Sequence, residues 1–179
     1  MGERFLVGLG NPGPAYRYHW HNVGYRCVEA LATGEWKDKR KSLWAQGPLT
    51  SLVLLKPQTY MNLSGDSVGL WMRQKGVLWV VHDDLDLPWG SLRIKIGGGD
   101  GGHRGLQSIT TACGSLYGRI RIGIGRPPTE TDVKDYVLSS VPEDKRDLLP
   151  VMFQYIRDHL DTWLSTPLDQ ARSLGSVRF

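Results

Sequence analysis

The sequence contains little cysteine and no long apolar run. Only two of its 179 residues are cysteine, and these two, Cys27 and Cys113, lie far apart and form no C-x-x-C pair. They argue against a disulfide framework or a zinc ribbon and favour a reducing, cytoplasmic compartment. No stretch approaches the roughly 18 apolar residues of a membrane-spanning helix, and the apolar run at the N-terminus is too short for a signal peptide. We therefore expect a cytoplasmic protein that does not contact a membrane.

Metal-binding signatures are equally scarce. The chain has no H-E-x-x-H motif, and neither cysteine stands in a catalytic motif. His19 and His21 are two residues apart, but at the start of a helix their side chains would diverge by about 200°, which disfavours a shared metal ion. We therefore expect no functional metal, and an activated water rather than a side chain as the attacking group.

The sequence is rich in glycine and has a small excess of positive charge. It has 22 glycines, and its 22 lysines and arginines against 18 aspartates and glutamates give a net charge of +4. A charge of this size does not by itself identify a polyanionic partner, so the distribution of the basic residues has to decide. The basic stretch 37–41 either attracts a polyanion or is a solvated loop.

Stretches with the pattern of strands alternate with stretches of helical periodicity along the chain. The predicted strands cover residues 5–9, 43–46, 51–55, 77–82, 91–96 and 119–124. The predicted helices cover residues 21–33, 64–73, 106–112, 132–138 and 143–164. This alternation predicts an α/β fold, with a mixed β-sheet surrounded by α-helices in a single domain over residues 1–179. We expect residues 165–179 to form a loose C-terminal tail.

The first predicted strand leads into Gly8-Leu9-Gly10-Asn11-Pro12-Gly13, which matches the G-x-G-x-x-G pattern of dinucleotide-binding loops. That pattern needs a helix that begins at the glycines, where free N–H groups meet the pyrophosphate. Pro12 and Pro14 remove two of those donors, and the helical periodicity begins only near His21. We therefore disfavour a nicotinamide-dependent enzyme. The Asn11 carboxamide, which both donates and accepts hydrogen bonds, suits a peptide or ester group instead.

His21 and Asp83 are the candidate catalytic pair. Asp83 follows a predicted strand at its carboxyl end, where open α/β sheets place ligand sites. His21 stands at the start of a predicted helix, where the helix dipole favours the neutral imidazole that a general base needs. A carboxylate on the other ring nitrogen would fix the tautomer and stabilise the imidazolium. The alternatives are a surface or capping histidine and an ordinary charged turn.

Two predicted strands each carry two basic residues, two positions apart: Arg93, Lys95, Arg119 and Arg121. This spacing puts both members of each pair on one face of the sheet. The glycine-rich loop between the strands, residues 97–105, contains His103 and Arg104. The arrangement predicts a phosphate clamp assisted by glycine N–H groups, unless the alternation only marks the solvent face of an edge strand.

Several segments together resemble the bacterial peptidyl-tRNA hydrolase family. They are LVGLGNPGPAYRYHWHNVG (6–24), LLKPQTYMNLSG (54–65), HDDLDLPWGSLRIKIGGGDGGHRGL (82–106), RIRIGIGRP (119–127) and DYVLS (135–139). Their order and spacing agree over nearly the whole chain, which is far more specific than any single motif. The resemblance implies one α/β domain that uses no metal or organic cofactor. It also implies hydrolysis of the ester that joins a peptide to tRNA.

The resemblance further implies roles for individual residues. His21, and not His19, corresponds to the catalytic base, and Asp83 corresponds to the carboxylate that orients it. Asn62 is implied to steady the reacting carbonyl or the water, and we count it as catalytic. The residues assigned to substrate binding are Asn11, Tyr16, Met61, His103 and Arg104. Those assigned to tRNA, at its acceptor stem and CCA end, are Arg93, Lys95, Arg119 and Arg121, of which Lys95 and Arg121 match phosphate-binding residues of the family.

One position departs from the family pattern. The glycine loop of the family commonly reads GGHNGL, whereas this chain has Arg104 in place of the asparagine. An arginine cannot accept a hydrogen bond, so that role is altered or lost, and Arg104 could instead contact a phosphate of the acceptor stem. The alternative is that the chain is a non-catalytic RNA-binding relative of the same fold. The presence of Asn11, His21, Asn62 and Asp83 favours the enzyme. We expect a monomer, although the sequence carries no direct signal of oligomeric state.

Overall fold

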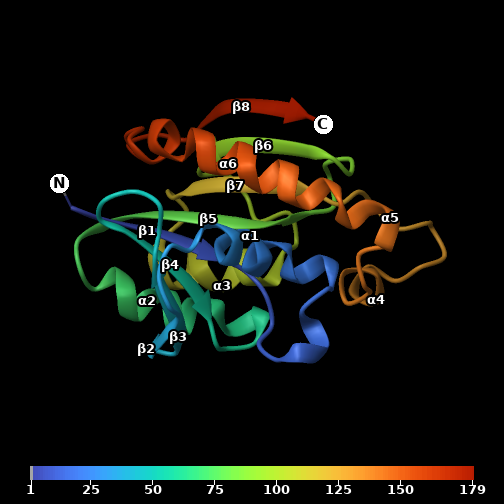
Figure 1. Cartoon of the computed structure of the whole chain (residues 1–179), viewed down its shortest axis with the longest axis horizontal. Helices are drawn as coiled ribbons and strands as arrows, with labels where there is room; N and C mark the ends of the chain where they lie inside the picture. The colour runs from blue at the N-terminus through green and yellow to red at the C-terminus, as the bar shows by residue number, and fades with distance from the viewer. Residues whose placement is uncertain (1) are drawn as a thin grey trace.

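A computed structural model describes residues 2–179 of the chain. It contains an eight-stranded sheet with the order β2-β3-β4-β1-β5-β7-β6-β8 (Figure 1). The strands are β1 (Glu3–Gly8), β2 (Lys37–Lys39), β3 (Ser42–Gln46), β4 (Leu52–Pro57), β5 (Gly76–Asp84), β6 (Ser91–Ile96), β7 (Gly118–Gly123) and β8 (Arg172–Arg178). The α-helices are α1 (Val23–Leu31), α2 (Ser64–Met72), α3 (Arg104–Cys113), α4 (Val133–Val137), α5 (Glu143–Arg146) and α6 (Leu148–Leu164). Short 3₁₀ helices are η1 (Pro14–Tyr16), η2 (Trp20–Asn22) and η3 (Met61–Leu63).

The sheet is mixed, as the sequence predicts. β4, β1, β5 and β7 run parallel, whereas β3, β6 and β8 pair antiparallel with their neighbours. β4 lies on one side of β1 and β5 lies on the other, so the direction of winding reverses at β1. Open α/β sheets bind ligands at such a switch point, beyond the carboxyl ends of the strands. In Figure 1 these ends point towards the loop before α1 and towards α4.

Helices cover both faces of the sheet. α1 and α6 pack against one apolar core, and α2 and α3 pack against a second core on the opposite face. Successive residues of β1 separate accordingly, because side chains alternate along a strand: Leu6 belongs to the first core, and Phe5 and Val7 belong to the second. The predicted α/β architecture is therefore confirmed, and β1 and β5 lie in its centre.

The C-terminal region departs most from the sequence prediction. The expectation of a loose tail over residues 165–179 is wrong for its second half, which forms β8 and pairs antiparallel with β6. Leu174 and Val177 of β8 pack against the first core. The backbone of β6 needs hydrogen-bond partners on both of its sides, and β8 satisfies the side that β7 leaves open. The basic stretch 37–41, which had no predicted structure, similarly contains the edge strand β2.

The long helix expected over residues 143–164 is also divided. α5 ends at Arg146 and α6 begins at Leu148. Pro150 lacks the N–H group that a continuous helix would need for a hydrogen bond to the carbonyl of Arg146, which explains the break.

Candidate active site

His21 and Asp83 are brought together at the switch point of the sheet. Nδ1 of His21 lies 2.8 Å from Oδ2 of Asp83, although the two residues are 62 positions apart in the chain. Asp83 lies at the carboxyl end of β5, and His21 lies in η2, directly before α1. The contact depends on the close approach of α1, since a Cβ at Gly24 would come within 2.4 Å of the carbonyl oxygen of Val81.

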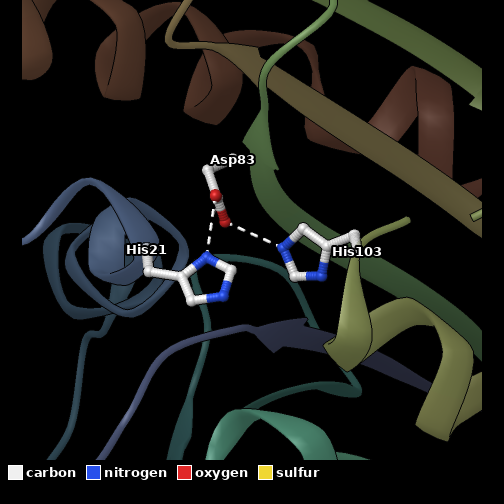
Figure 2. A group of neighbouring side chains, drawn as sticks. All are labelled: His21, Asp83 and His103. Carbon is white, nitrogen blue, oxygen red and sulfur yellow. Dashed lines mark hydrogen bonds and ion pairs between the residues drawn. The ribbon is translucent and has the colours of Figure 1, made fainter. Parts of the chain in front are cut away.

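A second histidine contacts the other oxygen of the same carboxylate. Nε2 of His103 lies 2.9 Å from Oδ1 of Asp83, and its Nδ1 accepts hydrogen bonds from the N–H groups of Gly105 and Leu106 at the start of α3. Because Nδ1 of His103 is an acceptor, its proton sits on Nε2 and is donated to Asp83. Figure 2 shows Asp83 between the two rings, with the second nitrogen of His21 directed away from it.

Asp83 controls the protonation of His21. Burial acts to lower the pKa of His21, but the charge of Asp83 and the hydrogen bond to it outweigh burial and raise the pKa. The net change is therefore opposite to the one expected from a helix dipole, because His21 lies in a 3₁₀ turn before the helix and Asp83 contacts its ring. Burial likewise acts to raise the pKa of Asp83, yet His21 and His103 hold it well below its usual value. Asp83 is thus a carboxylate that accepts two imidazole N–H groups.

His82 is a third histidine of the site, and the sequence analysis missed it. It is buried, its Nδ1 donates to the carbonyl oxygen of Asp83, and its ring stands edge-on to His103 with the centroids 5.2 Å apart. Burial lowers the pKa of His82 to about 3, with a further contribution from His103, so that it stays neutral. The signal was available in the sequence, because VVHDD places His82 next to Asp83 on a buried strand.

The candidate catalytic pair, His21 and Asp83, lines a cavity of about 870 Å³. The predicted residues that line it are Asn11, His21, Met61, Asn62, Asp83, Lys95, His103, Arg104, Arg119 and Arg121. Two predicted residues are not part of this lining. Tyr16 instead contacts His19 and Tyr60 edge-on, with ring centroids 5.5 and 6.5 Å apart. Arg93 is exposed on β6, so the roles of Tyr16 and Arg93 stay predictions.

Asn11 connects three loops around this cavity. Its Oδ1 accepts a hydrogen bond from the N–H of Met61 at 2.8 Å. Its backbone exchanges two hydrogen bonds with the side chain of Asn22, at 3.0 and 2.9 Å. Asn62 follows directly in η3 and is exposed at the cavity, while Met61 is buried. A Cβ at Gly105 would lie 2.5 Å from Sδ of Met61, so this glycine permits α3 to approach the loop.

The predicted tRNA-binding residues differ in accessibility. The register of β6 and β7 pairs Arg93 with Arg121 and Lys95 with Arg119, so all four lie on one face of the sheet. Arg119 is 1% exposed and donates to the carbonyl oxygens of Gly98 and Gly99. Its contact with tRNA therefore stays a prediction, and in this structure its guanidinium is engaged by the glycine loop.

Lys95 and Arg121 remain accessible to a ligand in the cavity. Arg121 donates from Nε to Oδ2 of Asp84 at 2.6 Å, a pairing that the sequence analysis missed. Lys95 is half-buried and makes no ion pair within 4.0 Å among residues 2–179. Burial lowers the pKa of Lys95, and the neighbouring charges of Arg121 and Arg119 lower it further. An anion at this point would relieve that repulsion.

A serine also stands in a pattern that resembles a nucleophile elbow. Gly65-Asp66-Ser67-Val68-Gly69 matches G-x-S-x-G, but Ser67 lies inside α2 and not at a strand-to-helix turn. Its side chain is fully buried, and its Oγ contacts Oγ of Ser42. Ser67 is therefore not placed to act as a nucleophile.

One group of side chains has the composition of a metal site. The nearest ligand atoms of His21, Asp83 and His103 all lie within 4.8 Å of one another. The same nitrogens, however, carry the protons that are donated to Asp83, and Nδ1 of His103 accepts from the backbone. A cation bound by these atoms would have to displace two protons, so the arrangement suits a hydrogen-bonded base better than a metal.

Comparison with known proteins identifies the family. Residues 5–176 match the family model described as "Peptidyl-tRNA hydrolase". The chain belongs to the peptidyl-tRNA hydrolase family. A peptidyl-tRNA hydrolase of Cereibacter sphaeroides is 45% identical over 165 residues, which cover 87% of this chain and 73% of the relative. One of Rickettsia canadensis is 37% identical over 180 residues, which cover 94% and 97%.

Solved structures of peptidyl-tRNA hydrolases have the same fold. A crystal structure of the enzyme from Acinetobacter baumannii superposes with a TM-score of 0.82 at 32% identity, over 90% of this chain and 88% of that one. The sequence resemblance is therefore confirmed at the level of family and fold. Within residues 2–179, no helix combines the length and the apolar character needed to span a bilayer.

Proposed function

We propose that this chain hydrolyses the ester bond between peptide and tRNA in peptidyl-tRNA, with a water activated by His21. The observation that carries the proposal is the His21–Asp83 hydrogen bond, which fixes the proton on Nδ1 and leaves Nε2 as the free base. Family membership supports the reaction, and neither the family match nor the solved relatives support the non-catalytic alternative.

The reaction then proceeds in two steps. Nε2 of His21 takes a proton from a water whose oxygen attacks the ester carbonyl, and Asp83 stabilises the imidazolium that forms. The imidazolium next protonates the ribose oxygen as the C–O bond breaks, which releases the peptide acid and the tRNA hydroxyl. Asn62, exposed at the cavity, donates to the oxyanion, and such a donor contributes about 3 kcal/mol to transition-state stability.

Substrate recognition combines amide contacts with phosphate contacts. The carboxamide of Asn11 holds the acyl group, which favours a blocked, peptide-like group over a free and charged amine. Lys95 and Arg121 bind phosphates of the acceptor stem and CCA end, and Arg104 adds a further phosphate contact where relatives commonly have asparagine. Binding is therefore salt-dependent and insensitive to sequence, and we propose that the enzyme acts as a monomer.

The test is release of N-acetyl-aminoacyl groups from tRNA, compared with unblocked aminoacyl-tRNA. We expect the acetylated substrate to be hydrolysed and the unblocked one to be spared. His21→Ala should lower kcat by at least about a hundredfold, while His19→Ala, the matched control in the same loop, should retain activity. Full activity in His21→Ala would sink the mechanism. No release by the parent protein would favour an RNA-binding function.

A further inference from the structure

Three arginines surround one exposed tyrosine next to the catalytic loop. The guanidinium carbons of Arg17, Arg26 and Arg146 lie 5.8, 5.3 and 5.0 Å from the centre of the Tyr18 ring. Nε of Arg146 donates a hydrogen bond to the carbonyl oxygen of Val141. The N–H of Val141 donates to the carbonyl oxygen of Tyr18, so Arg146 is held beside the tyrosine. Each cation gains from the ring face, but the three repel one another. An anionic ligand would relieve this repulsion.

Two of these arginines line a cavity of about 310 Å³, which we call the basic cavity. Its charged lining residues are Arg17, Arg26, Lys56 and Glu29. The single carboxylate is already used, since Glu29 lies 2.7 Å from Nζ of Lys56 and 3.9 Å from Arg17. Three cations and one carboxylate leave an excess of positive charge in the cavity. This excess matches a ligand with one or two negative charges.

Among the three cations of the basic cavity, Arg26 is the one without an ion pair to a residue in the range 2–179. Its Nη1 is buried and has no hydrogen-bond partner among residues 2–179, and no carboxylate of that range lies within 4.0 Å of it. Burial lowers the pKa of Arg26, and the charges of Arg146 and Arg17 add to this, whereas Tyr18 and Glu29 oppose it. Arg26 therefore has no countercharge in an ion pair, and a carboxylate ligand in the cavity would be bound with a gain in charge pairing.

The strand order separates the basic cavity from the phosphate-binding side of the enzyme. Across the sheet, the neighbouring strands follow the order β6, β7, β5, β1 and β4. Lys95 and Arg121 lie on β6 and β7, at one end of this order, and Lys56 lies on β4, at the other end. Asp83, on β5, and Asn11, directly after β1, lie between them. The catalytic pair therefore lies between the phosphate contacts and the basic cavity. Asn11 lines both the basic cavity and the catalytic cavity, so the two meet at this residue. An RNA 3′ end that approaches from β6 and β7 directs its acyl group towards Asn11 and the basic cavity.

We propose that the basic cavity binds acidic side chains of the peptide, so that hydrolysis favours peptidyl-tRNAs with Asp or Glu shortly before the esterified residue. This inference rests on the proposed function and adds a substrate preference to it. The preference comes from Arg17 and Arg26, which the catalytic step does not use. Partly exposed ion pairs of this kind are worth a rate ratio of about two- to fivefold.

The test compares N-acetylated dipeptidyl- and tripeptidyl-tRNAs that share the same tRNA and the same C-terminal phenylalanine. In the dipeptidyl series, the residue directly before the phenylalanine is Asp, Asn or Lys. In the tripeptidyl series, the residue two positions before the phenylalanine is varied in the same way. We expect kcat/KM to be about two- to fivefold higher for Asp than for Asn at one of these positions, and lowest for Lys. The position with the larger ratio reports which residue of the peptide reaches the cavity.

Variants assign the preference to the cavity. Arg17→Gln, at a side chain that is 58% exposed, and Arg26→Gln should each bring the Asp/Asn ratio towards one, while Arg26→Lys should retain it. Arg73→Gln, an exposed arginine at the other end of the sheet, is the matched control and should change nothing. N-acetyl-phenylalanyl-tRNA, which has no such side chain, should be hydrolysed equally by all four variants.

Two results would overturn the proposal while the proposed function stands. One is equal hydrolysis of the Asp, Asn and Lys substrates at both positions by the parent enzyme. The other is a rise in KM for every substrate alike in Arg26→Gln, with a weaker salt dependence, which would assign the cavity to RNA phosphates. Failure to hydrolyse any of these substrates would instead contradict the proposed function itself.

Discussion

Nδ1 of His21 lies 2.8 Å from Oδ2 of Asp83, so the carboxylate orients the imidazole and raises its pKa. The two contributions of Asp83, its charge and its hydrogen bond, together exceed the opposing effect of burial on the pKa of His21. The second ring nitrogen of His21 is directed away from Asp83, and the proposed role of His21 as the base can be separated experimentally from the roles of its neighbours.

The first prediction concerns pH. A general base works only when it is neutral, so the raised pKa of His21 places the acidic limb of kcat/KM above the ordinary histidine value of about 6.5. In Asp83→Asn the negative charge is lost and the hydrogen bond to His21 weakens, while the burial of His21 remains. The pKa of His21 should therefore fall, and the acidic limb of kcat/KM should move to lower pH. The rate plateau should also fall by about a hundredfold or more, because the imidazolium loses its carboxylate. Profiles of both proteins between about pH 5 and 9 check this, and an unmoved or higher limb in Asp83→Asn would contradict it.

The second prediction separates the two functions of His103. This side chain caps α3 through Nδ1 and contacts Asp83 through Nε2. His103→Ala should lose both, with a loss of about 1 kcal/mol in unfolding free energy from the missing cap and a lower kcat. His103→Asn should retain the stability, since asparagine is a good N-cap, but not the contact with Asp83. Thermal unfolding and kcat of both variants test this, and parent-like kcat in both would remove His103 from the site.

The third prediction distinguishes a cation that a ligand can reach, Lys95, from a buried one, Arg119. Lys95→Gln should weaken tRNA binding and lower the slope of log K against log salt by about one, without loss of stability. Arg119→Gln should instead destabilise the fold by about 1–3 kcal/mol, because it leaves the carbonyl oxygens of Gly98 and Gly99 without their donors. Filter binding at several salt concentrations and denaturant unfolding measure the two effects. A stable Arg119→Gln protein with a lower salt slope would instead support a direct contact between Arg119 and tRNA.

The fourth prediction concerns metal removal. The nitrogens of His21 and His103 that face Asp83 carry protons, so a chelator should leave kcat and kcat/KM unchanged. Added Zn²⁺ should inhibit if it binds at all, since binding would displace the proton on Nδ1 of His21. Assays after dialysis against EDTA, with and without added metal, check this. Loss of activity that returns with a divalent cation would show that the three side chains form a metal site.

Much of the fold follows from local sequence patterns. Continuous apolar runs predicted the central strands β1 and β5, because a strand with helices on both faces is buried at nearly every position, whereas alternation predicted β6. β6 was predicted with its observed bounds, Ser91–Ile96, while the other central strands shifted by a few residues at their ends. The edge strands β2 and β8 were missed, since their burial pattern is weak and only the neighbouring strand makes them regular.

The sequence by itself determined which residues have useful chemistry and at which ends of the strands they stand, because these depend on residue type and local periodicity. It placed Asp83 at the carboxyl end of a central strand, as the structure confirms, and His21 at the start of the helix after the first strand, whereas His21 lies in the 3₁₀ turn before that helix. Only tertiary packing decided that His103 contacts the same carboxylate and that the guanidinium of Arg119 donates to the carbonyl oxygens of Gly98 and Gly99. These contacts join residues far apart in the chain, and their distances depend on how closely the helices approach the sheet.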